Sequence, residues 1–486
     1  MNRRELLKLM LAGSANGWLA ACAESARTQP LPQARARQTT PAQSESLYWD
    51  VIIVGAGVAG LRAGQVLQQS GLRILVLEAR DHIGGRVWTD ESTGLPLDLG
   101  ASWIHGVRGN PITDIANRSQ AALIETDYSD ILRFDSAGTP LTDDLSRRIE
   151  DLLERYIESA REYANAQHSD MSLQGALDAV LRQAPLSAQD ARLLNYALNT
   201  VFEHEYAADT SRLSAQHFDN QDRFSGGDAL FKQGYRAVTD FLARNLDIRL
   251  NHIVQRIARD PGGVTLTVTA PRAAPGAWRA RMALITAPLG VLKRGSIAFE
   301  PSLPFAKQQS IERLGMGLLN KCYLVFPAAF WDDATLLGYV SERKGEWAEW
   351  LNLRVLLGVP ALLGFNAASY ASALEKQSDD QIIESAMQTL RRLYGADIPQ
   401  PIDYRITRWA SDPFAFGSYS YIAAGASPED YDSLAQPVGE QLFFAGEHTQ
   451  RDYPATVHGA YLSGERAANE ILAALARSRP AENRRR

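Results

Sequence analysis

Three glycines near residue 55 have the spacing of a phosphate-binding turn. The run Gly55-Ala56-Gly57-Val58-Ala59-Gly60 follows an apolar segment, 48–54, that reads as a buried strand, and precedes a helical pattern that ends at Gly71. The first glycine permits a tight turn, the second lets the backbone approach a pyrophosphate, and the third lets helix and strand pack closely. A second strand, 73–77, ends at Glu78, which can accept hydrogen bonds from ribose hydroxyls. This arrangement predicts a dinucleotide-binding unit; a glycine turn in an ordinary α/β unit is the structural alternative.

The residues that follow indicate a larger cofactor than a nicotinamide dinucleotide. Gly84 and Gly85 lie between Arg80 and Arg86, two guanidinium groups that can reach phosphate oxygens. Near the C-terminus, Gly446 and the residues after it connect an apolar segment to a helical pattern beginning near residue 455. A helix N-terminus there can stabilise negative charge on a reduced flavin ring. The same helix must also pack against the core.

Four blocks, in this order, resemble the flavin-containing amine oxidase family. They are 55–86, 97–106 (Leu-Asp-Leu-Gly-Ala-Ser-Trp-Ile-His-Gly), 319–321 (Leu-Asn-Lys) and 444–449 (Phe-Ala-Gly-Glu-His-Thr). The family includes monoamine, polyamine and L-amino acid oxidases and the lysine-specific histone demethylase. The resemblance implies an α/β fold, with a Rossmann-like FAD-binding domain interwoven with an α+β substrate domain whose mixed sheet is flanked by helices. It also implies non-covalent FAD, because the chain lacks the cysteine that covalent members carry near the C-terminal flavin block.

The resemblance assigns roles to five residues. Lys321 matches the lysine that holds a water against the flavin's reactive nitrogen; an exposed lysine at a strand start is the alternative. Trp409 matches the tryptophan beside the isoalloxazine, and Tyr419 matches one aromatic wall of the amine slot. Thr456 stands where monoamine and plant polyamine oxidases have a second tyrosine, so one ring is expected to suffice. His105 matches animal spermine-type oxidases, whereas plant relatives carry glutamate; a structural histidine is the alternative.

The glycine turns and the resemblance together give a set of expected cofactor contacts. These are Gly55, Gly57, Gly60, Glu78, Arg80, Gly84, Gly85, Arg86, Gly100, Ala101, Ser102, Trp103, Gly446, Glu447, Thr456 and Val457. Trp103 stands near the place where amino-acid oxidases have an arginine for the substrate carboxylate, which argues against α-amino acids. The eight histidines include no metal-spaced pair, so no metal site is expected.

These residues require two domains that the chain enters more than once. We expect the FAD-binding domain to comprise 47–109, 227–298 and 412–475, and the substrate-binding domain to comprise 110–226 and 299–411. The first substrate segment is helical by pattern, and the second reads as strands plus one helix, at 379–394. Such an interweaving builds a substrate slot at the domain interface. Three acids lie where the chain passes from the first substrate segment back toward the FAD-binding domain: Glu203, Glu205 and Asp209. They could attract a polycation; a solvated acidic loop is the alternative.

The N-terminal residues indicate export. Residues 1–22 combine Arg3-Arg4, a modest apolar stretch and the sequence Leu-Ala-Ala before Cys22, which resembles a twin-arginine or lipoprotein-type signal. A short helix with an incidental cysteine is the alternative. Residues 23–46 read as a flexible linker and 476–486 as a solvated tail. We therefore expect the twin-arginine export machinery as a partner, a periplasmic or cell-envelope location, and a lipid anchor through Cys22.

Composition sets the outer limits on function. The 486-residue chain has a formal net charge of −6, which disfavours nucleic acid as a partner, and no run of about 20 apolar residues. The expected function is oxidation of a polyamine or monoamine to an imine and then an aldehyde, by hydride transfer to FAD, with O2 reduced to H2O2. Two alternatives stay open: a flavin-dependent desaturase or dehydrogenase acting on a non-amine substrate, and a non-catalytic flavin-binding envelope protein.

Overall fold

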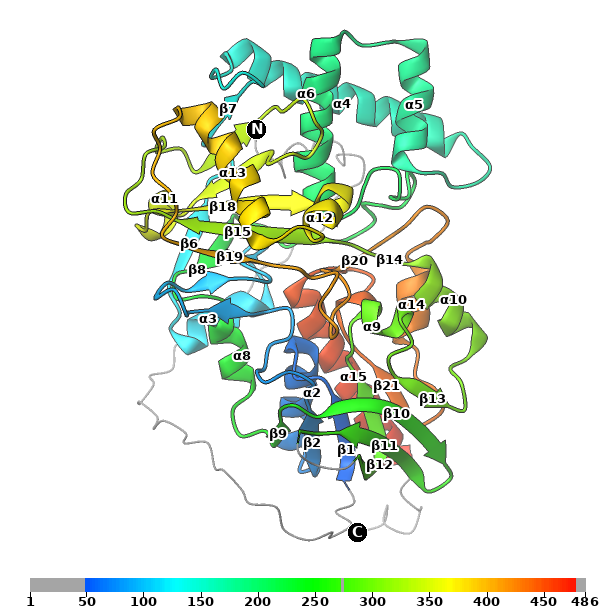
Figure 1. Ribbon diagram of the computed structural model, residues 1–486. Coiled ribbons are helices and arrows are strands. Elements are labelled where there is room, and N and C mark those ends of the chain that lie inside the picture. The colour runs from blue at the N-terminus through cyan, green and yellow to red at the C-terminus, as the bar shows by residue number, and fades with distance from the viewer. Residues whose placement is uncertain (1–48, 272–274, 478–486) are drawn as a thin grey trace, which may run out of the picture.

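The computed structural model describes residues 49–271 and 275–477, arranged around two large sheets (Figure 1). The predicted signal (1–22), the predicted linker (23–46) and most of the predicted tail lie outside the described residues. In Figure 1 the eight-stranded sheet, with α2 and α15, occupies the lower half, and the six-stranded sheet the upper half. The expected α/β class is confirmed. No helix among the described residues is long and apolar enough to cross a bilayer.

The eight-stranded sheet has a parallel centre. Its order is β13-β10-β11-β12-β1-β2-β9, and β21 pairs in parallel with β12 beyond the end of β11. The side chains of β1 and β2 are almost all buried, as expected for parallel strands covered on both faces. The strands are β1 Trp49–Val54, β2 Ile74–Leu77, β9 Ile248–Arg249, β10 Ile253–Asp260, β11 Gly263–Thr269, β12 Gly276–Ile285, β13 Ala298–Glu300 and β21 Leu442–Phe444.

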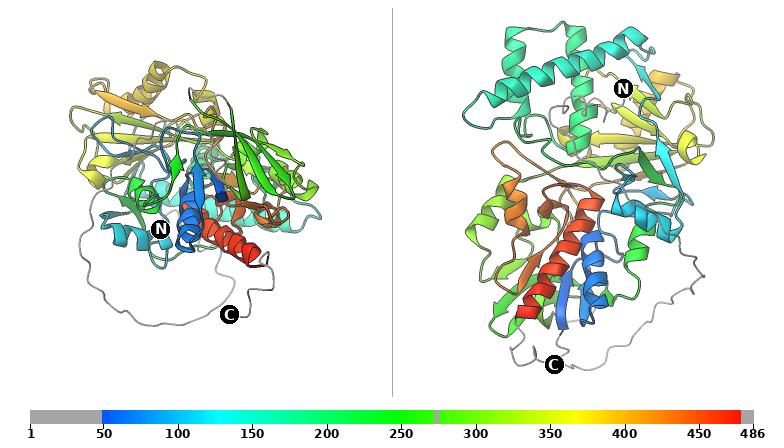
Figure 2. Two further views of the ribbon diagram at one scale, coloured as in Figure 1. Left: turned by 90° about the horizontal axis from the view of Figure 1, so that it is seen from below. Right: turned by 180° about the vertical axis from the view of Figure 1, so that it is seen from behind.

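Two helices from opposite ends of the chain lie side by side against this sheet. They are α2 (Val58–Gln69) and α15 (Val457–Arg477), seen together in the right-hand view of Figure 2. A Cβ on Gly464 would lie 2.2 Å from the carbonyl oxygen of Ala59, so only glycine permits this approach. Gly464 therefore serves the packing of α15 on α2.

The six-stranded sheet forms the upper half of the molecule. Its order is β19-β15-β18-β17-β16-β7. Its strands are β7 Ile131–Phe134, β15 Leu319–Val325, β16 Leu336–Tyr339, β17 Glu349–Asn352, β18 Ala361–Ala367 and β19 Asp403–Ile406. The helix predicted at 379–394 is confirmed as α13, Asp379–Tyr394, which begins at a capping box formed by Ser378 and Gln381.

The remaining elements complete both halves. The helices are α3 Pro111–Ser119, α4 Asp143–Asn165, α5 Leu173–Gln183, α6 Ala188–Ala197, the π-helix η1 Leu198–Glu203, α7 His204–Tyr206, α8 Arg236–Leu242, α9 Leu289–Lys293, α10 Phe305–Arg313, α11 Leu353–Leu357, α12 Ala368–Leu374, α14 Glu429–Ala435 and the 3-10 helix η2 Glu447–Thr449. The short strands are β3 Thr89–Asp90, β4 Leu97–Asp98, β5 Trp103–Ile104, β6 Leu123–Thr126, β8 Asp228–Phe231, β14 Gly315–Met316 and β20 Ser420–Tyr421.

Two secondary-structure expectations were wrong. The segment 110–226 is not helical throughout, because it also contains β6 and β7. These strands pair with β8 and β16, which lie far along the chain, so tertiary pairing rather than local pattern decides their conformation. The segment 299–411 contains short helices in addition to the one expected. The assignment of the residue ranges to two domains stays a prediction.

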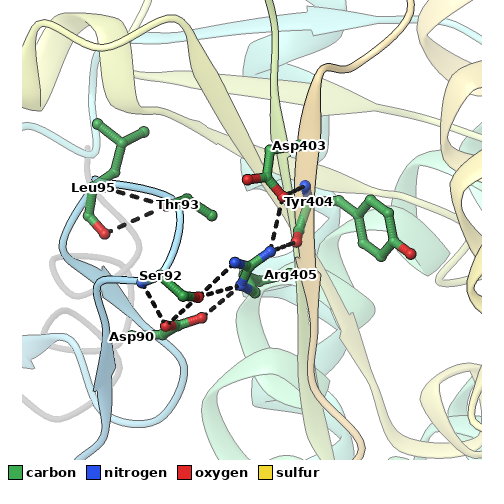
Figure 3. A network of polar contacts seen from close by, with 7 residues as sticks. All are labelled: Asp90, Ser92, Thr93, Leu95, Asp403, Tyr404 and Arg405. Atoms are coloured by element: carbon green, nitrogen blue, oxygen red, sulfur yellow. Dashed lines mark hydrogen bonds and ion pairs between the residues drawn. The ribbon is translucent and has the colours of Figure 1, made fainter.

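Polar contacts tie the two halves together at one edge. Arg405, on β19, donates to the Asp90 carboxylate at 2.5 Å and to the Ser92 hydroxyl from a second nitrogen at 2.5 Å (Figure 3). It also donates to Asp403 on its own strand at 2.8 Å. Although burial alone would raise the pKa of Asp90, hydrogen bonds from Ser92 and the Arg405 charge lower it overall. The carboxylate therefore stays ionised against the guanidinium.

Candidate active site

One cavity collects nearly all the residues expected to do chemistry. Among the expected cofactor contacts only Gly60 is absent from its lining, and the five residues expected to act on the substrate all line it. Those five are His105, Lys321, Trp409, Tyr419 and Thr456. The residues predicted to hold the cofactor, Gly60 apart, and those predicted to act on the substrate therefore line one cavity, and their roles stay a prediction.

The glycine turn forms the floor of the cavity at the end of β1. Gly57 and Gly84 form a β-bridge, and the Gly84 N–H donates to the Ala56 carbonyl at 2.9 Å, so the two glycine runs lie against each other. A Cβ on Gly60 would lie 2.1 Å from the Gly55 carbonyl oxygen. Gly60 thus allows the helix to pack on the strand, while the other glycines face the cavity.

Glu78 is held at the mouth of this turn by backbone donors. Its carboxylate accepts from the Ala56 N–H at 2.7 Å and from the Arg80 N–H at 2.8 Å, and the residue is 5% exposed. Each carboxylate oxygen retains acceptor capacity, because an ionised carboxylate has about four lone-pair sites. The acid is therefore fixed in place and lines the cavity with acceptor sites to spare.

The two arginines that bracket the diglycine have carboxylate partners. Arg80 donates to both oxygens of Asp412, at 2.8 and 2.7 Å. Arg86 donates to Glu447 and to the Ser418 carbonyl, each at 2.8 Å. Burial would raise the pKa of Glu447, but Arg86 and other neighbours outweigh it and lower that pKa. Both arginines line the cavity, and each also links two segments that lie far apart in the sequence.

Lys321 lies on β15 with its ammonium group fully engaged. The residue is 4% exposed, and its Nζ donates to the carbonyls of Asp98 and Gly100 at 2.7 and 2.6 Å and to the Ser102 hydroxyl at 2.5 Å. Burial lowers the pKa of Lys321, and the neighbouring Asp98 charge opposes that shift. The exposed-lysine alternative is wrong, because three acceptors and a nearby carboxylate offset the cost of burial.

Tyr419, Trp409 and Thr456 line the cavity, which two other tyrosines, Tyr128 and Tyr206, also line. Tyr419 donates its hydroxyl to the His204 carbonyl at 2.8 Å. Trp409 is 4% exposed and donates through Nε1 to the Leu99 carbonyl at 3.2 Å. The Thr456 hydroxyl accepts from the Gly459 N–H at 2.9 Å, which caps α15, and donates to the Tyr453 carbonyl at 2.8 Å. Thr456 thus offers the cavity mainly its methyl group.

Comparison with known proteins shows the family to which this chain belongs. A model of the flavin-containing amine oxidoreductases matches residues 58–472. The chain belongs to this family. It is 37% identical over 437 residues to polyamine oxidase 2 of Arabidopsis thaliana, an alignment that covers 86% of this chain and 87% of that protein. It is also 37% identical over 448 residues to lysine-specific histone demethylase 1 homolog 2 of Oryza sativa subsp. japonica, covering 89% of this chain and 58% of that one.

A solved structure shares the fold. Putrescine oxidase bound to putrescine superposes with a TM-score of 0.71 at 22% identity, covering 88% of this chain and 99% of that one. The family and its fold confirm an FAD-dependent amine oxidoreductase with the interwoven α/β architecture. The protein oxidises amines with non-covalently bound FAD.

The residues present fit this cofactor. A Cβ on Gly100 would lie 1.9 Å from the Arg86 carbonyl oxygen, and one on Gly446 would lie 2.6 Å from the His448 ring, so glycine is required where the chain closes around the cavity. The N-terminus of α15 points its N–H groups toward the cavity end that holds Thr456 and Val457. Cys322, the cysteine among the described residues, is fully buried and does not line the cavity.

The three acids near the end of the first predicted substrate segment have different environments. Glu203 is buried at the end of the π-helix η1, with the Lys344 ammonium 2.7 Å from its carboxylate. Asp209 accepts from the Ser369 hydroxyl at 2.7 Å. Glu205 lines the cavity. A solvated loop is therefore wrong for Glu203, and π-helical turns often accompany functional sites such as this one.

Sequence reasoning missed several polar residues in and around the cavity. The imidazole of His204 lies 3.6 Å from the buried Glu349 carboxylate, and both residues line the cavity. Tyr128 also lines it, and donates to Asp228 at 3.2 Å. Asp228 follows two glycines and begins an otherwise apolar strand, and an acid in that position could have been recognised from the sequence as a candidate. The other positions carry no local signal.

Proposed function

We propose that the substrate is a polyamine-like amine carrying more than one positive charge. Relatives named polyamine oxidase, and a structural neighbour bound to putrescine, favour this class. Three carboxylates that line the cavity favour it as well, because they attract cations into a site of low dielectric constant. These are Glu205, Asp222 and Glu349. The observation that carries the proposal is that one cavity is lined both by the glycine turn and by these carboxylates.

The chain's own residues orient and desolvate the amine. Tyr419 and Trp409 supply flat aromatic surfaces, which favour the neutral amine over the ammonium ion as water is excluded. Lys321 places its positive charge beside the segment that lines the cavity, with its three donors bonded to Asp98, Gly100 and Ser102. His105 lies on the substrate side, and Thr456 leaves room where other members have a second ring.

The cofactor carries the electron chemistry. When bound, FAD would supply the two-electron chemistry: a hydride would leave the carbon next to the substrate nitrogen for the cofactor, and O2 would take up the two electrons as H2O2. The imine product is hydrolysed by water to an aldehyde and a shorter amine. The residues that hold FAD are those of the glycine turn, Glu78 and the segment at Gly446.

Anaerobic stopped-flow spectroscopy against a panel of amines tests the substrate class. We expect spermine, spermidine or putrescine to bleach the flavin with a higher second-order rate constant than benzylamine or a simple monoamine. The Glu205→Gln variant should weaken binding of the multiply charged amines more than that of the monoamine. Asp209→Asn is the matched control, because its carboxylate is held by Ser369 outside the cavity. Equal rates for both amine classes would contradict the polyamine assignment, and no bleaching with any amine would contradict the reaction.

We also propose export by the twin-arginine route, with lipidation at Cys22. Arg3-Arg4 and the Leu-Ala-Ala sequence before Cys22 support this. The route suits a protein that acquires its cofactor before crossing the membrane. Arg3→Lys combined with Arg4→Lys should retain the protein in the cytoplasm of an expressing bacterium, and Cys22→Ser should abolish incorporation of labelled palmitate. Unchanged fractionation of the double variant would contradict the proposal.

A further inference from the structure

His105 and Asp228 face each other across two antiparallel strands. The register of β5 and β8 pairs Trp103 with Leu230 and Ile104 with Ala229, so the next pair is residue 105 with residue 228. Directly opposed residues point their side chains to the same face of a sheet. The Nδ1 atom of His105 accordingly lies 3.0 Å from Asp228 Oδ2.

Hydrogen bonds stabilise the ionised form of Asp228. Its side chain is 1% exposed. Oδ1 accepts from the Gly106 N–H at 2.9 Å, and Oδ2 accepts from the Tyr128 hydroxyl at 3.2 Å. Donors that bond to a carboxylate favour its charged form, which can only accept. The proton between Asp228 and His105 therefore belongs to Nδ1 of the imidazole.

This tautomer leaves the other ring nitrogen with a lone pair. In the neutral imidazole with Nδ1 protonated, Nε2 is an acceptor. The His105 side chain is 37% exposed and lines the cavity beside Trp103. Within residues 49–271 and 275–477, no side chain or backbone group hydrogen-bonds to Nε2. The ring that carries this basic nitrogen is thus partly exposed and lines the cavity.

We propose that Asp228 is a positioning residue that holds His105 in this tautomer, and that His105 Nε2 takes a proton from the incoming substrate ammonium. The inference rests on the proposed amine substrate. One N–H bond of the ammonium breaks, its electron pair stays on the substrate nitrogen, and a new N–H bond forms at Nε2. The positive charge moves to the imidazole, where the Asp228 carboxylate stabilises it. The substrate is then the neutral amine that hydride loss requires, and the imidazolium later returns its proton to water.

The charged and titratable groups around His105 are consistent with this direction of transfer. Asp228 and Tyr128 face the ring from β8 and from the segment after β6. Lys321 lies beyond Trp103, with Nζ 5.9 Å from the centre of the indole ring and bonded to other acceptors. His458 is separated from His105 by Asn110, which donates to the His105 carbonyl at 3.1 Å. The carboxylate is thus the charge in direct contact with the ring.

The pH dependence of flavin reduction tests the proton step. Anaerobic stopped-flow rates with spermine or spermidine are measured from pH 7 to 10.5 for the wild type, Asp228→Asn, His105→Gln and the double variant. We expect each single variant to lower the second-order rate constant about 10²-fold at pH 7.5, which is the lower end of general-base contributions. The gap should close as the pH approaches the pKa of an alkylammonium group, about 10.4 for lysine, because the substrate then arrives neutral.

The double variant is the matched control for a shared role. If the two residues act as one unit, removing both costs no more than removing either. A loss that is the same at every pH, or losses that multiply in the double variant, would overturn the inference. The absorbance of bound flavin and the melting temperature identify a variant that has failed to fold. If Asp228→Asn fails to fold, His105→Gln alone tests the proton step.

A second measurement is independent of turnover. In protein with ¹⁵N-labelled histidine, the His105 ring, identified by its loss in His105→Gln, should show a protonated Nδ1 and a bare Nε2. An amine without hydrogen on the carbon next to nitrogen cannot be oxidised, and its binding should convert this ring to the imidazolium form. Asp228→Asn should abolish the preference for the Nδ1–H tautomer. A ring that stays neutral with the bound amine would refute the proton step even if the enzyme oxidises amines. Failure of all amines to bleach the flavin would instead refute the proposed function and leave the tautomer result standing.

Discussion

Two glycine-to-alanine substitutions, three residues apart, separate cofactor binding from folding. Gly57 has φ −74° and ψ 175°, a conformation that alanine adopts freely, and a Cβ there would find its nearest neighbour, the Gly84 carbonyl oxygen, at 3.9 Å. Gly57 lines the cavity. A Cβ on Gly60 would instead lie 2.1 Å from the Gly55 carbonyl oxygen, and Gly60 does not line the cavity. The first change fills cofactor space, whereas the second forces helix and strand apart.

The expected magnitudes follow from these contacts. Gly57→Ala reduces the conformational freedom of the unfolded chain, which stabilises the folded protein by about 0.4–1 kcal/mol. Alanine is a poorer N-cap residue than glycine for α2, which costs a similar amount. The free energy of unfolding should therefore change little. The added methyl group displaces the pyrophosphate from the turn. Losing one charge-assisted hydrogen bond costs about 1.5–3 kcal/mol, or roughly 10- to 150-fold in the Kd for FAD. For Gly60→Ala, overpacking should destabilise the protein by about 1–3 kcal/mol or more.

The assay measures flavin content and stability on the same preparations. Absorbance gives the fraction of bound FAD after dilution, and thermal unfolding is followed with and without added FAD. We expect Gly57→Ala to lose FAD on dilution and to regain it when FAD is added, while Gly60→Ala melts at a lower temperature under both conditions. Wild-type retention of FAD by Gly57→Ala would refute the placement of the pyrophosphate over this turn.

Three further predictions follow from other contacts. Burial lowers the pKa of Lys321 below the ordinary lysine value of about 10.4, so the unfolded chain binds more protons than the folded one between the two pKa values, and stability should rise with pH up to about 10.4. Thermal melts of Lys321→Met should lack this rise, and an unchanged pH slope would contradict the prediction. Arg405→Ala should lower the free energy of unfolding by about 1–2 kcal/mol in urea titrations, because the Asp90 carboxylate loses its guanidinium, while the spectrum of bound flavin stays as in the wild type. Tyr419→Ala should raise the Kd for the amine measured from flavin bleaching far more than Tyr419→Phe, since the ring face rather than the hydroxyl contacts the substrate; equal effects would assign the role to the hydroxyl that bonds His204.

The parts of the site that could be predicted from the sequence are those encoded locally. The glycine turn and Glu78 lie within 24 residues and specify one strand–turn–helix–strand unit, so spacing alone identified them. The placement of Lys321 and Trp409 came from resemblance to a family. The Arg80–Asp412 pair could not be foreseen, because its members are 332 residues apart and only the tertiary fold brings them together.

The His105–Asp228 pair is a second contact that could not be predicted from the sequence alone. Nothing local relates residues separated by 123 positions. They become neighbours because β5 and β8 pair in one register, and a shift of one residue would turn the side chains to opposite faces. The strands β6 and β7 were missed for the same reason, since their partners lie in other segments.

The segment from Asp98 to His105 positions both groups that the proposed chemistry uses. At one end, the carbonyls of Asp98 and Gly100 hold the Lys321 ammonium. At the other, the imidazole of His105 meets the buried Asp228. Because Gly100 sits so close to the Arg86 carbonyl that no side chain fits, the first end is fixed against the cofactor turn, while strand pairing fixes the second. The backbone from Gly100 to His105 therefore separates the Lys321 ammonium from the imidazole that accepts the proton, and both residues line one cavity.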